Sequence, residues 1–373
     1  MDVLSTLGGG TGLIVVAAVS AYRKSRRAQR AAAAAAAPAP AGGGRTIDPA
    51  AYGFVPGDQI DTTRVAADPE GEAVEAAARA GDWRSAAAYL EAAGTDWDLR
   101  WYRLGHLSNA AADDDTFVKA WLAERPNDPG AALVHADAMV ALAGKLRGAK
   151  TAKHTTQEQF DAFHRVLAES EAACRRAAEL APADPSPYIA QIWIAVGLGW
   201  SHERFQALWA EIVSRAPHHF GAHTAALQYW CAKWRGSHEL MHEFARKAAA
   251  SAPAGDLLAA LPLFAVFEQE IRDGNDAIFR LPETAAAVDA AWREVAQAPL
   301  GHHRLPQVRH VLAYSLEGVG RHAEAVQQFQ LIGPFCGAFP WNYYSNPLKE
   351  FGNSRARAAV GWENAGRPPV PQV

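Results

Sequence analysis

Three Ala-Pro dipeptides recur along the middle of the chain at intervals of about 35 residues, each directly after an alanine-rich run: Ala181-Pro182, Ala216-Pro217 and Ala252-Pro253. An interval of this length holds two helices and two turns, and proline marks the point where a helix cannot continue. A single pair of helices cannot bury its apolar side alone, so neighbouring pairs stack and share a core. The spacing therefore predicts an all-α solenoid of antiparallel helix pairs.

Local patterns place the individual helices. In residues 73–93 two helices meet at Gly81-Asp82, and the second has one apolar face formed by Ala86, Leu90 and Ala93. Helix starts are expected at the Asp-Pro dipeptides Asp128-Pro129 and Asp184-Pro185. Five further helices are predicted over residues 157–180, 188–199, 202–215, 220–234 and 238–251.

A second well-defined helix pair lies near the end of the region. Its first helix is lined by Leu312, Ala313 and Leu316, its turn falls at Gly320, and its second helix is lined by Ala325 and Phe329. This alternation of large and small residues around a glycine turn, seen here and in residues 73–93, resembles tetratricopeptide repeats. The resemblance covers residues 70–335 and implies a scaffold that binds proteins or peptides. Trp193 and Trp209 depart from its small-residue positions. Residues 234–239 also resemble uncharacterised helical-repeat proteins of high-GC bacteria.

The chain begins with an uncharged stretch, residues 3–22, followed by a basic cluster at Arg23, Lys24, Arg26, Arg27 and Arg30. Twenty uncharged residues can just span a bilayer, and flanking basic residues stay on the cytoplasmic side. We therefore predict a single-pass membrane anchor in residues 1–30, a low-complexity linker in residues 31–69, and a cytoplasmic repeat domain. A disordered leader on a cytoplasmic protein is the alternative.

Residues 336–373 change in character, because aromatic residues alternate with glycine and proline around Gly337, Pro340 and Tyr343. We expect an irregular cap or tail here. Its role is either to cover the last apolar repeat face or to dock on a partner.

Composition excludes several function classes. The formal net charge is −4, so the chain lacks the basic surface that nucleic-acid binding requires. The three cysteines, Cys174, Cys231 and Cys336, are far apart and form neither a disulfide framework nor a zinc knuckle. No glycine-rich phosphate loop or serine elbow is present, and we expect no cofactor.

One motif offers chemistry. His238-Glu239-Leu240-Met241-His242 fits the H-E-x-x-H pattern, in which two histidines on one helix face hold zinc and the glutamate acts as general base. Zinc peptidases look similar locally, and Glu268 or Glu270 would supply a third ligand. The alternative function is therefore a zinc-dependent hydrolase with Glu239 as its catalytic residue and His238, His242 and Glu268 as its ligands.

The repeat offers a plainer explanation. Ser201-His202-Glu203 precedes Ser237-His238-Glu239 by 36 residues, one period of the repeat. Serine caps a helix, and glutamate in the first turn complements the helix dipole. A second histidine group at 218, 219 and 223 is expected at one rim of the solenoid.

Tryptophan is the remaining signal, with Trp193, Trp200, Trp230 and Trp234 in the middle repeats. Tryptophan is enriched in binding hot spots, and it also fills space between helices. These residues are our candidate binding site for a protein or peptide partner. The sequence favours a non-catalytic scaffold and leaves the oligomeric state open.

Overall fold

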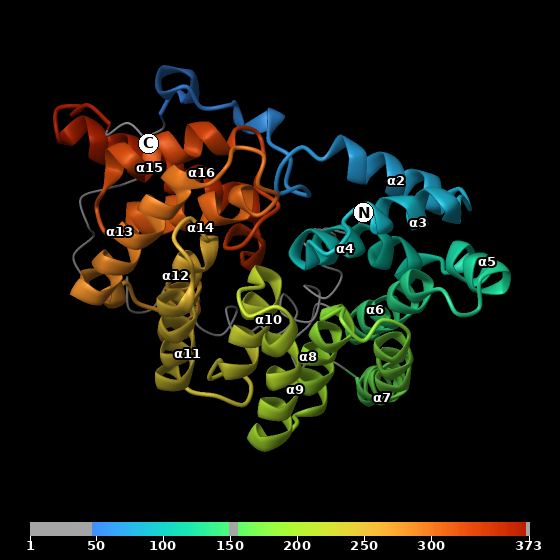
Figure 1. Ribbon diagram of the computed structural model, residues 1–373. Helices are drawn as coiled ribbons and strands as arrows, with labels where there is room; N and C mark the ends of the chain where they lie inside the picture. Colours follow the sequence, from blue (N-terminus) through green and yellow to red (C-terminus); the bar gives the residue numbers. More distant parts are fainter. Residues whose placement is uncertain (1–46, 149–155, 371–373) are drawn as a thin grey trace. The chain divides into compact units, whose positions relative to one another are not determined.

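The computed structural model describes residues 47–148 and 156–370 of the chain (Figure 1). The predicted membrane anchor, residues 3–22, and residues 31–46 of the predicted linker lie outside these residues. Within them, none of the helices combines the length and apolar character that crossing a bilayer requires.

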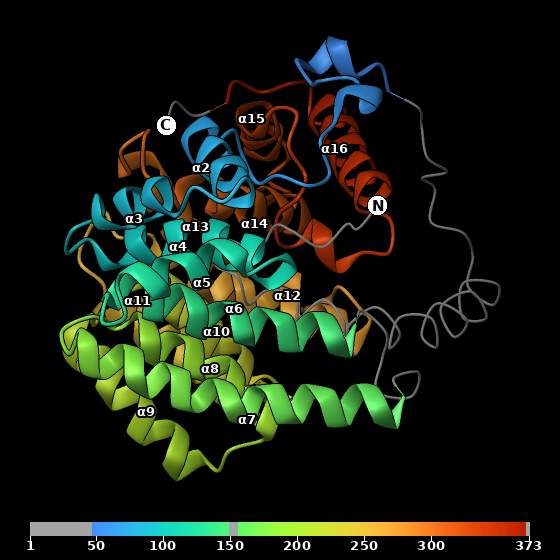
Figure 2. The same cartoon turned by 90° about the vertical axis from the view of Figure 1, so that its right-hand side faces the viewer.

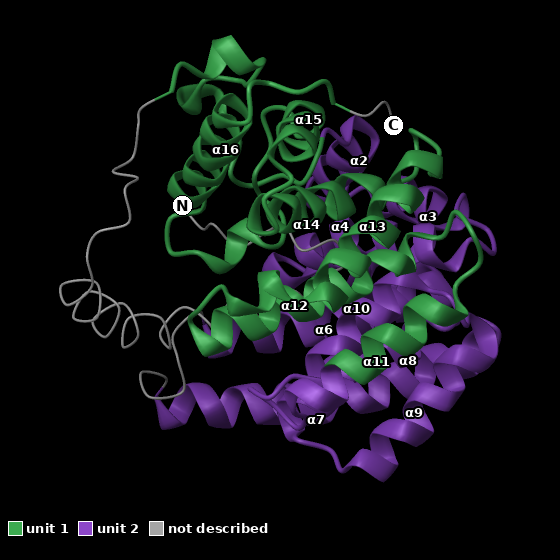
Figure 3. Ribbon diagram, turned by 90° about the vertical axis from the view of Figure 1, so that its left-hand side faces the viewer, with its two compact units in different colours: residues 1–6, 19–66, 242–373 green, residues 7–18, 67–241 purple. Residues whose placement is uncertain are grey.

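The fold is all-α, as predicted: the described residues contain helices and a single isolated β-bridge, with no strand. They divide into two compact units (Figure 3). Unit 2 runs from residue 67 to 241 and unit 1 comprises residues 47–66 and 242–370, so helix α11 begins in unit 2 and continues into unit 1.

Unit 2 is built from helices alone in its described residues. Its helices are α2 (Pro69–Arg79), α3 (Trp83–Glu91), α4 (Trp97–Asp113), α5 (Thr116–Glu124), α6 (Pro129–Arg147), α7 (Gln157–Leu180), α8 (Ser186–Leu198), α9 (His202–Arg215), α10 (Phe220–Trp230) and the start of α11 (His238–Ser251). Helices α7, α9 and α11 end directly before the three Ala-Pro dipeptides, as the sequence predicts. Asp68, Asp82, Asp96 and Asp128 cap the starts of α2, α3, α4 and α6.

The even-numbered helices form an inner row in which α4 contacts α6, α6 contacts α8 and α8 contacts α10, while α6 and α7 pack along one another (Figure 2). The row bends so strongly that α10 also reaches α4. At that contact the His219 Nε2 bonds the Trp97 carbonyl at 3.2 Å, and the Gly221 amide donates to Asp98 at 2.9 Å. Residues 122 positions apart in the chain are thereby in contact.

The limits of two helices differ from the prediction. Helix α8 runs from Ser186 to Leu198 and not over residues 188–199. Helix α10 ends at Trp230 and not at residue 234. The chain folds back so tightly after it that a Cβ on Gly236 would lie 1.8 Å from the Trp230 carbonyl oxygen. Trp234 therefore lies in a turn after the helix.

Unit 1 contains η1 (Pro49–Tyr52), η2 (Gly57–Gln59), η4 (Leu257–Ala260), α12 (Leu261–Asp273), η5 (Ala277–Arg280), α13 (Pro282–Gln297), α14 (Leu305–Gly318), α15 (His322–Ile332), η6 (Trp341–Tyr343) and α16 (Pro347–Asn364). Helices α14 and α15 are the predicted pair, and their turn falls at Gly320, whose φ is +80°. An aromatic core joins the last elements of this unit and is formed by Phe329 of α15, Trp341 of η6 and Phe351 of α16.

Two predicted boundaries need correction. Residues 47–66, assigned to a linker, pack against the rest of unit 1, and their Tyr52 and Phe54 side chains are buried. Residues 336–373, expected to be irregular, contain the 18-residue helix α16. Both segments are rich in glycine and proline, and in both cases distant residues supply the packing partners that order them.

Candidate functional site

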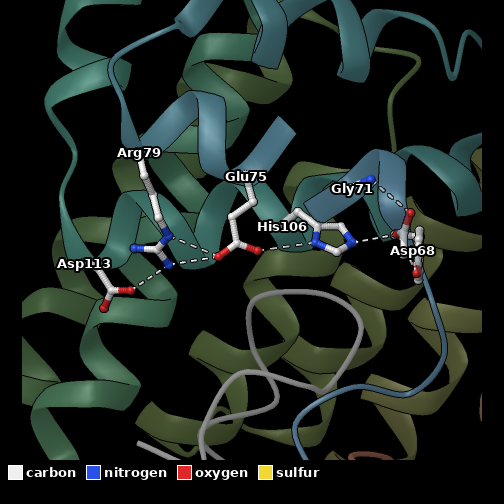
Figure 4. Close-up of polar contacts among 7 residues, drawn as sticks. Asp68, Gly71, Glu75, Arg79, His106 and Asp113 are labelled. Carbon is white, nitrogen blue, oxygen red and sulfur yellow. Dashed lines mark hydrogen bonds and ion pairs between the residues drawn. The ribbon is translucent and has the colours of Figure 1, made fainter. Parts of the chain in front are cut away.

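The most concentrated polar cluster in unit 2 is an ion network between α2 and α4, centred on His106 (Figure 4). The His106 Nε2 lies 3.0 Å from an Asp68 oxygen, and its Nδ1 lies 3.5 Å from a Glu75 oxygen. Arg79 donates to the other Glu75 oxygen at 2.9 Å and to Asp113 at 3.0 Å. Positive and negative groups therefore alternate along the line between the two helices.

The start of α2 positions this network. Asp68 caps the helix by accepting from the Gly71 amide at 2.9 Å, and its second oxygen also accepts from the Tyr102 hydroxyl at 2.9 Å. A Cβ at residue 71 would lie 2.6 Å from both Asp68 Oδ2 and His106 Nε2. Glycine is therefore required here so that the histidine can reach the carboxylate.

The two carboxylates keep His106 protonated. Burial alone lowers the pKa of His106, but its hydrogen bonds to Asp68 and Glu75 outweigh burial and raise the pKa to about 9. The hydrogen bond with His106 in turn lowers the pKa of Asp68. Burial raises the pKa of Glu75, and hydrogen bonds from His106 and Arg79 bring it below its usual value. All members of the network are ionised at neutral pH.

The network continues to a third helix, because Lys145 at the end of α6 pairs with Asp113. Both ring nitrogens of His106 already face carboxylates, so neither can act as a general base or a metal ligand without breaking a contact. The arrangement is suited to holding α2, α4 and α6 in register. We assign it a positioning role and no catalytic role.

Replacing His106 by leucine should lower the free energy of unfolding by roughly 2 kcal/mol at pH 6.5, because Asp68 and Glu75 lose the cation between them. The folded-state pKa is raised, so this stabilisation is complete below the unfolded pKa and disappears as the pH rises through about 9. Urea unfolding of wild type and His106→Leu at pH 6.5 and pH 9.5 measures the loss of unfolding free energy at each pH. His164→Leu, at an exposed histidine of α7, is the control. An equal loss at both pH values would contradict the charged clamp.

Two of the four tryptophans proposed as binding residues are buried inside the fold. Trp193 is 5% exposed and Trp200 is 7% exposed, whereas Trp230 and Trp234 are half-buried. The Arg204 guanidinium lies 3.3 Å from the centre of the Trp200 ring. Trp193 and Trp200 contribute to helix packing in this structure and present little surface to a partner.

The H-E-x-x-H motif lies at the beginning of α11, with Glu239 exposed in its first turn. His242 Nε2 bonds the Gln269 side-chain oxygen at 2.7 Å, and Glu268 accepts from the Tyr343 hydroxyl at 2.6 Å. Within residues 47–148 and 156–370, no group of three or more His, Cys, Asp or Glu side chains has the arrangement of a metal site. The motif's third expected ligand, Glu268, is thus engaged in a hydrogen bond to tyrosine.

Two members of the second histidine group, His219 and His223, form hydrogen bonds at the start of α10. The His219 Nδ1 accepts from the Ala222 amide at 3.1 Å and caps the helix, and the His223 Nδ1 bonds the His219 carbonyl at 3.0 Å. Burial lowers the pKa of His223 to about 4. Both side chains are buried.

A buried polar cluster in unit 1 connects α12 to the segment before α16. Glu270 accepts from the Tyr314 hydroxyl at 3.1 Å, and Tyr314 bonds the Tyr344 hydroxyl at 2.9 Å. Glu268 and Tyr343 form the second link. These contacts fix the aromatic segment 341–344 on α12, and sequence reasoning considered the two glutamates only as metal ligands.

Sequence reasoning also missed His106, Asp68 and Glu75. The Asp68-Pro69 dipeptide is a helix-start signal of the same kind as Asp128-Pro129 and could have located α2. No sequence pattern marks His106, because its partners are 31 and 38 residues away.

Comparisons of the chain with protein-family models, with curated proteins and with solved structures found no match.

Proposed function

We propose that this protein is a non-catalytic scaffold, a solenoid of stacked tetratricopeptide-like helix pairs that holds a protein or peptide partner. Residues 1–30 would tether it to the cytoplasmic face of the cell membrane. The proposal rests on the helical architecture of the two units.

The observation that carries the proposal is a set of side-chain contacts repeated at one repeat's separation. In unit 2, Asp113 bonds Arg79, 34 residues before it, and Lys145, 32 residues after it. Arg204 of α9 bonds Glu171 of α7 at 2.8 Å, 33 residues apart. Unit 1 repeats the relation at 2.6 Å between Arg321 and Asp289, 32 residues apart. Helices that are equivalent in successive pairs would make such contacts in a stacked array.

The test compares wild type with Glu239→Gln for partner binding and cell function. A scaffold should retain both, because Glu239 is exposed in a first helical turn and its charge contributes at most about 1 kcal/mol there. A zinc hydrolase would lose nearly all turnover with its general base. Loss of function with an unchanged melting temperature would favour the hydrolase, as would one zinc per chain that survives dialysis.

Partner binding is measured by capture with the full chain from membranes of the native host, followed by titration of the purified candidate. Saturable binding supports the scaffold, and its absence for every captured protein contradicts it. In the same cells, removal of residues 1–30 should move the protein from the membrane fraction to the soluble fraction. A full chain that is already soluble would contradict the tether.

A further inference from the structure

Residues 47–66, which we call the strap, lie across α15 and α16 of unit 1 (Figure 2). The strap is not part of any helix pair and contains only the short 3-10 helices η1 and η2. Its main-chain carbonyls accept hydrogen bonds from side chains 245 to 300 positions away in the chain. The strap thus docks on unit 1 in the manner of a bound peptide.

Two aromatic residues anchor the strap. Tyr52 is 6% exposed and Phe54 is 4% exposed. The two rings stack at 5.9 Å, and the Phe54 ring meets Phe329 of α15 edge-on at 6.2 Å. The Arg355 guanidinium lies between rings, 5.2 Å from Phe54 and 4.9 Å from Phe351. Buried aromatic anchors of this kind supply most of the binding energy in peptide interfaces.

The residue between the anchors must be glycine. Gly53 has a φ of +68°, a conformation that residues with a side chain rarely adopt. A Cβ at this position would also lie 3.3 Å from the Gln330 side-chain nitrogen. The face therefore selects an aromatic-glycine-aromatic sequence.

Side chains of α15 and α16 also donate hydrogen bonds to main-chain carbonyls of the strap. Gln330 Nε2 donates to the Tyr52 carbonyl at 2.7 Å, and Arg355 Nη1 donates to the Val55 carbonyl at 2.9 Å. Arg355 is 4% exposed, and its Nε has no hydrogen-bond partner among the described atoms. A buried guanidinium that bonds a main-chain carbonyl and lies between aromatic rings is suited to peptide recognition.

The second half of the strap pairs with the backbone after α15. The Asp61 amide donates to the Pro334 carbonyl at 2.7 Å, and the Cys336 and Gly337 amides donate to strap carbonyls at 2.8 Å. His310 accepts from the Trp341 indole through Nδ1, so its Nε2 carries the proton and donates to the Val65 carbonyl. These bonds include one isolated parallel β-bridge, between Asp61 and Phe335, and hold the second half of the strap against the segment after α15.

We propose that the face formed by α15 and α16 is a docking site for an aromatic-glycine-aromatic turn of a partner protein, and that Tyr52-Gly53-Phe54 occupies this site within the chain until that segment replaces it. The inference rests on the proposed scaffold function and names its binding surface. The strap acts as an internal competitor at an effective concentration of about 1 mM, the scale for a short tether.

The experiment measures whether the face binds the strap sequence in trans. The probe is a fluorescent peptide of residues 47–66, titrated by anisotropy with the full chain carrying Gly53→Val, which strains the strap and leaves α15 and α16 intact. The matched control is Gly57→Val, because a Cβ at residue 57 meets no atom within 4 Å. We expect the Kd of the peptide for the Gly53→Val chain to be about tenfold lower, or lower still, than its Kd for the wild-type or Gly57→Val chain.

Specificity is tested with a second peptide that carries Gly53→Val itself, which should bind at least tenfold more weakly. If Gly53→Val unfolds the chain by circular dichroism, Phe54→Ala replaces it as the variant with a weakened strap. Absence of saturable binding, or equal affinity for both peptides, overturns the docking site. A partner captured by the wild-type chain would then leave the scaffold function standing with another surface. Peptide docking without any captured partner would instead support the site and contradict the scaffold function.

Discussion

Replacing Asp137 by asparagine is expected to remove a loss of folding stability that unit 2 otherwise suffers as the pH rises. Asp137 lies in the middle of α6 with no exposed surface, and neither carboxyl oxygen has a hydrogen bond of normal geometry among the described residues. Burial raises the pKa of Asp137 to about 7, opposed only by the nearby Ser108 hydroxyl of α4. The carboxyl is therefore neutral in mildly acidic solution and half ionised near pH 7.

The direction of the pH effect on stability follows from the difference in proton binding between the folded and unfolded states. The folded-state pKa lies above the unfolded value of about 3.9, so the folded state holds the extra proton, and stability falls as the pH rises toward 7. A difference of about three pKa units corresponds to about 4 kcal/mol above pH 7, of which roughly 2–3 kcal/mol is lost between pH 5 and pH 8. Asparagine cannot ionise and does not incur this loss.

Urea unfolding of wild type and Asp137→Asn at pH 5 and pH 8 measures the effect. Raising the pH from 5 to 8 should lower the free energy of unfolding of wild type by roughly 2–3 kcal/mol more than that of Asp137→Asn. In melting temperature this is roughly 5–10 °C for a unit of this size. The exposed Asp58→Asn serves as control. A difference that does not change with pH would mean that Asp137 has an ordinary pKa.

The second large effect is expected at the buried ion pair between Arg100 and Asp184. Arg100 Nε donates to Asp184 at 2.7 Å, and Arg100 Nη1 donates to the Leu90 carbonyl at 3.0 Å. The other Asp184 oxygen accepts from the Ser186 amide at 2.8 Å. The two side chains are 10% and 3% exposed, so they join α4 to the start of α8 away from water.

Arg100→Met should cost about 3–5 kcal/mol, because it leaves the Asp184 carboxylate buried without a cation. The same substitution at Arg280, whose pair with Asp276 is 69% and 73% exposed, should cost less than about 1 kcal/mol. Denaturant unfolding of both variants measures the difference. Adding Asp184→Leu to Arg100→Met should recover much of the loss, since no unpaired charge then remains buried. Similar costs for Arg100→Met and Arg280→Met would contradict the buried pair.

Helix limits in the middle repeats could be predicted from sequence because their signals are local. Helices α7, α9 and α11 have the predicted limits, set by a capping threonine at 156, a serine at 201, and the Ala-Pro dipeptides. Each signal acts within about four residues of the boundary. The end of α10 was missed because Gly236 folds back onto Trp230, a contact across a turn.

Burial and pairing could not be predicted in the same way. The tryptophans were recognised as either binding or packing residues, and only the arrangement of helices decides that Trp193 and Trp200 are enclosed. The strap has the composition of a linker, and it is ordered by Gln330 and Arg355, about 280 and 300 residues later.

By itself, the sequence determined the all-α class, the period of about 35 residues and most helix limits, since caps, prolines and apolar spacing act over one or two turns. Only the tertiary structure decided that His106 is charged between two carboxylates, that Asp137 is enclosed with no hydrogen bond of normal geometry among the described residues, and that the strap packs on α15 and α16. Desolvation and ion pairing depend on which distant side chains meet, and that follows from how the helices pack.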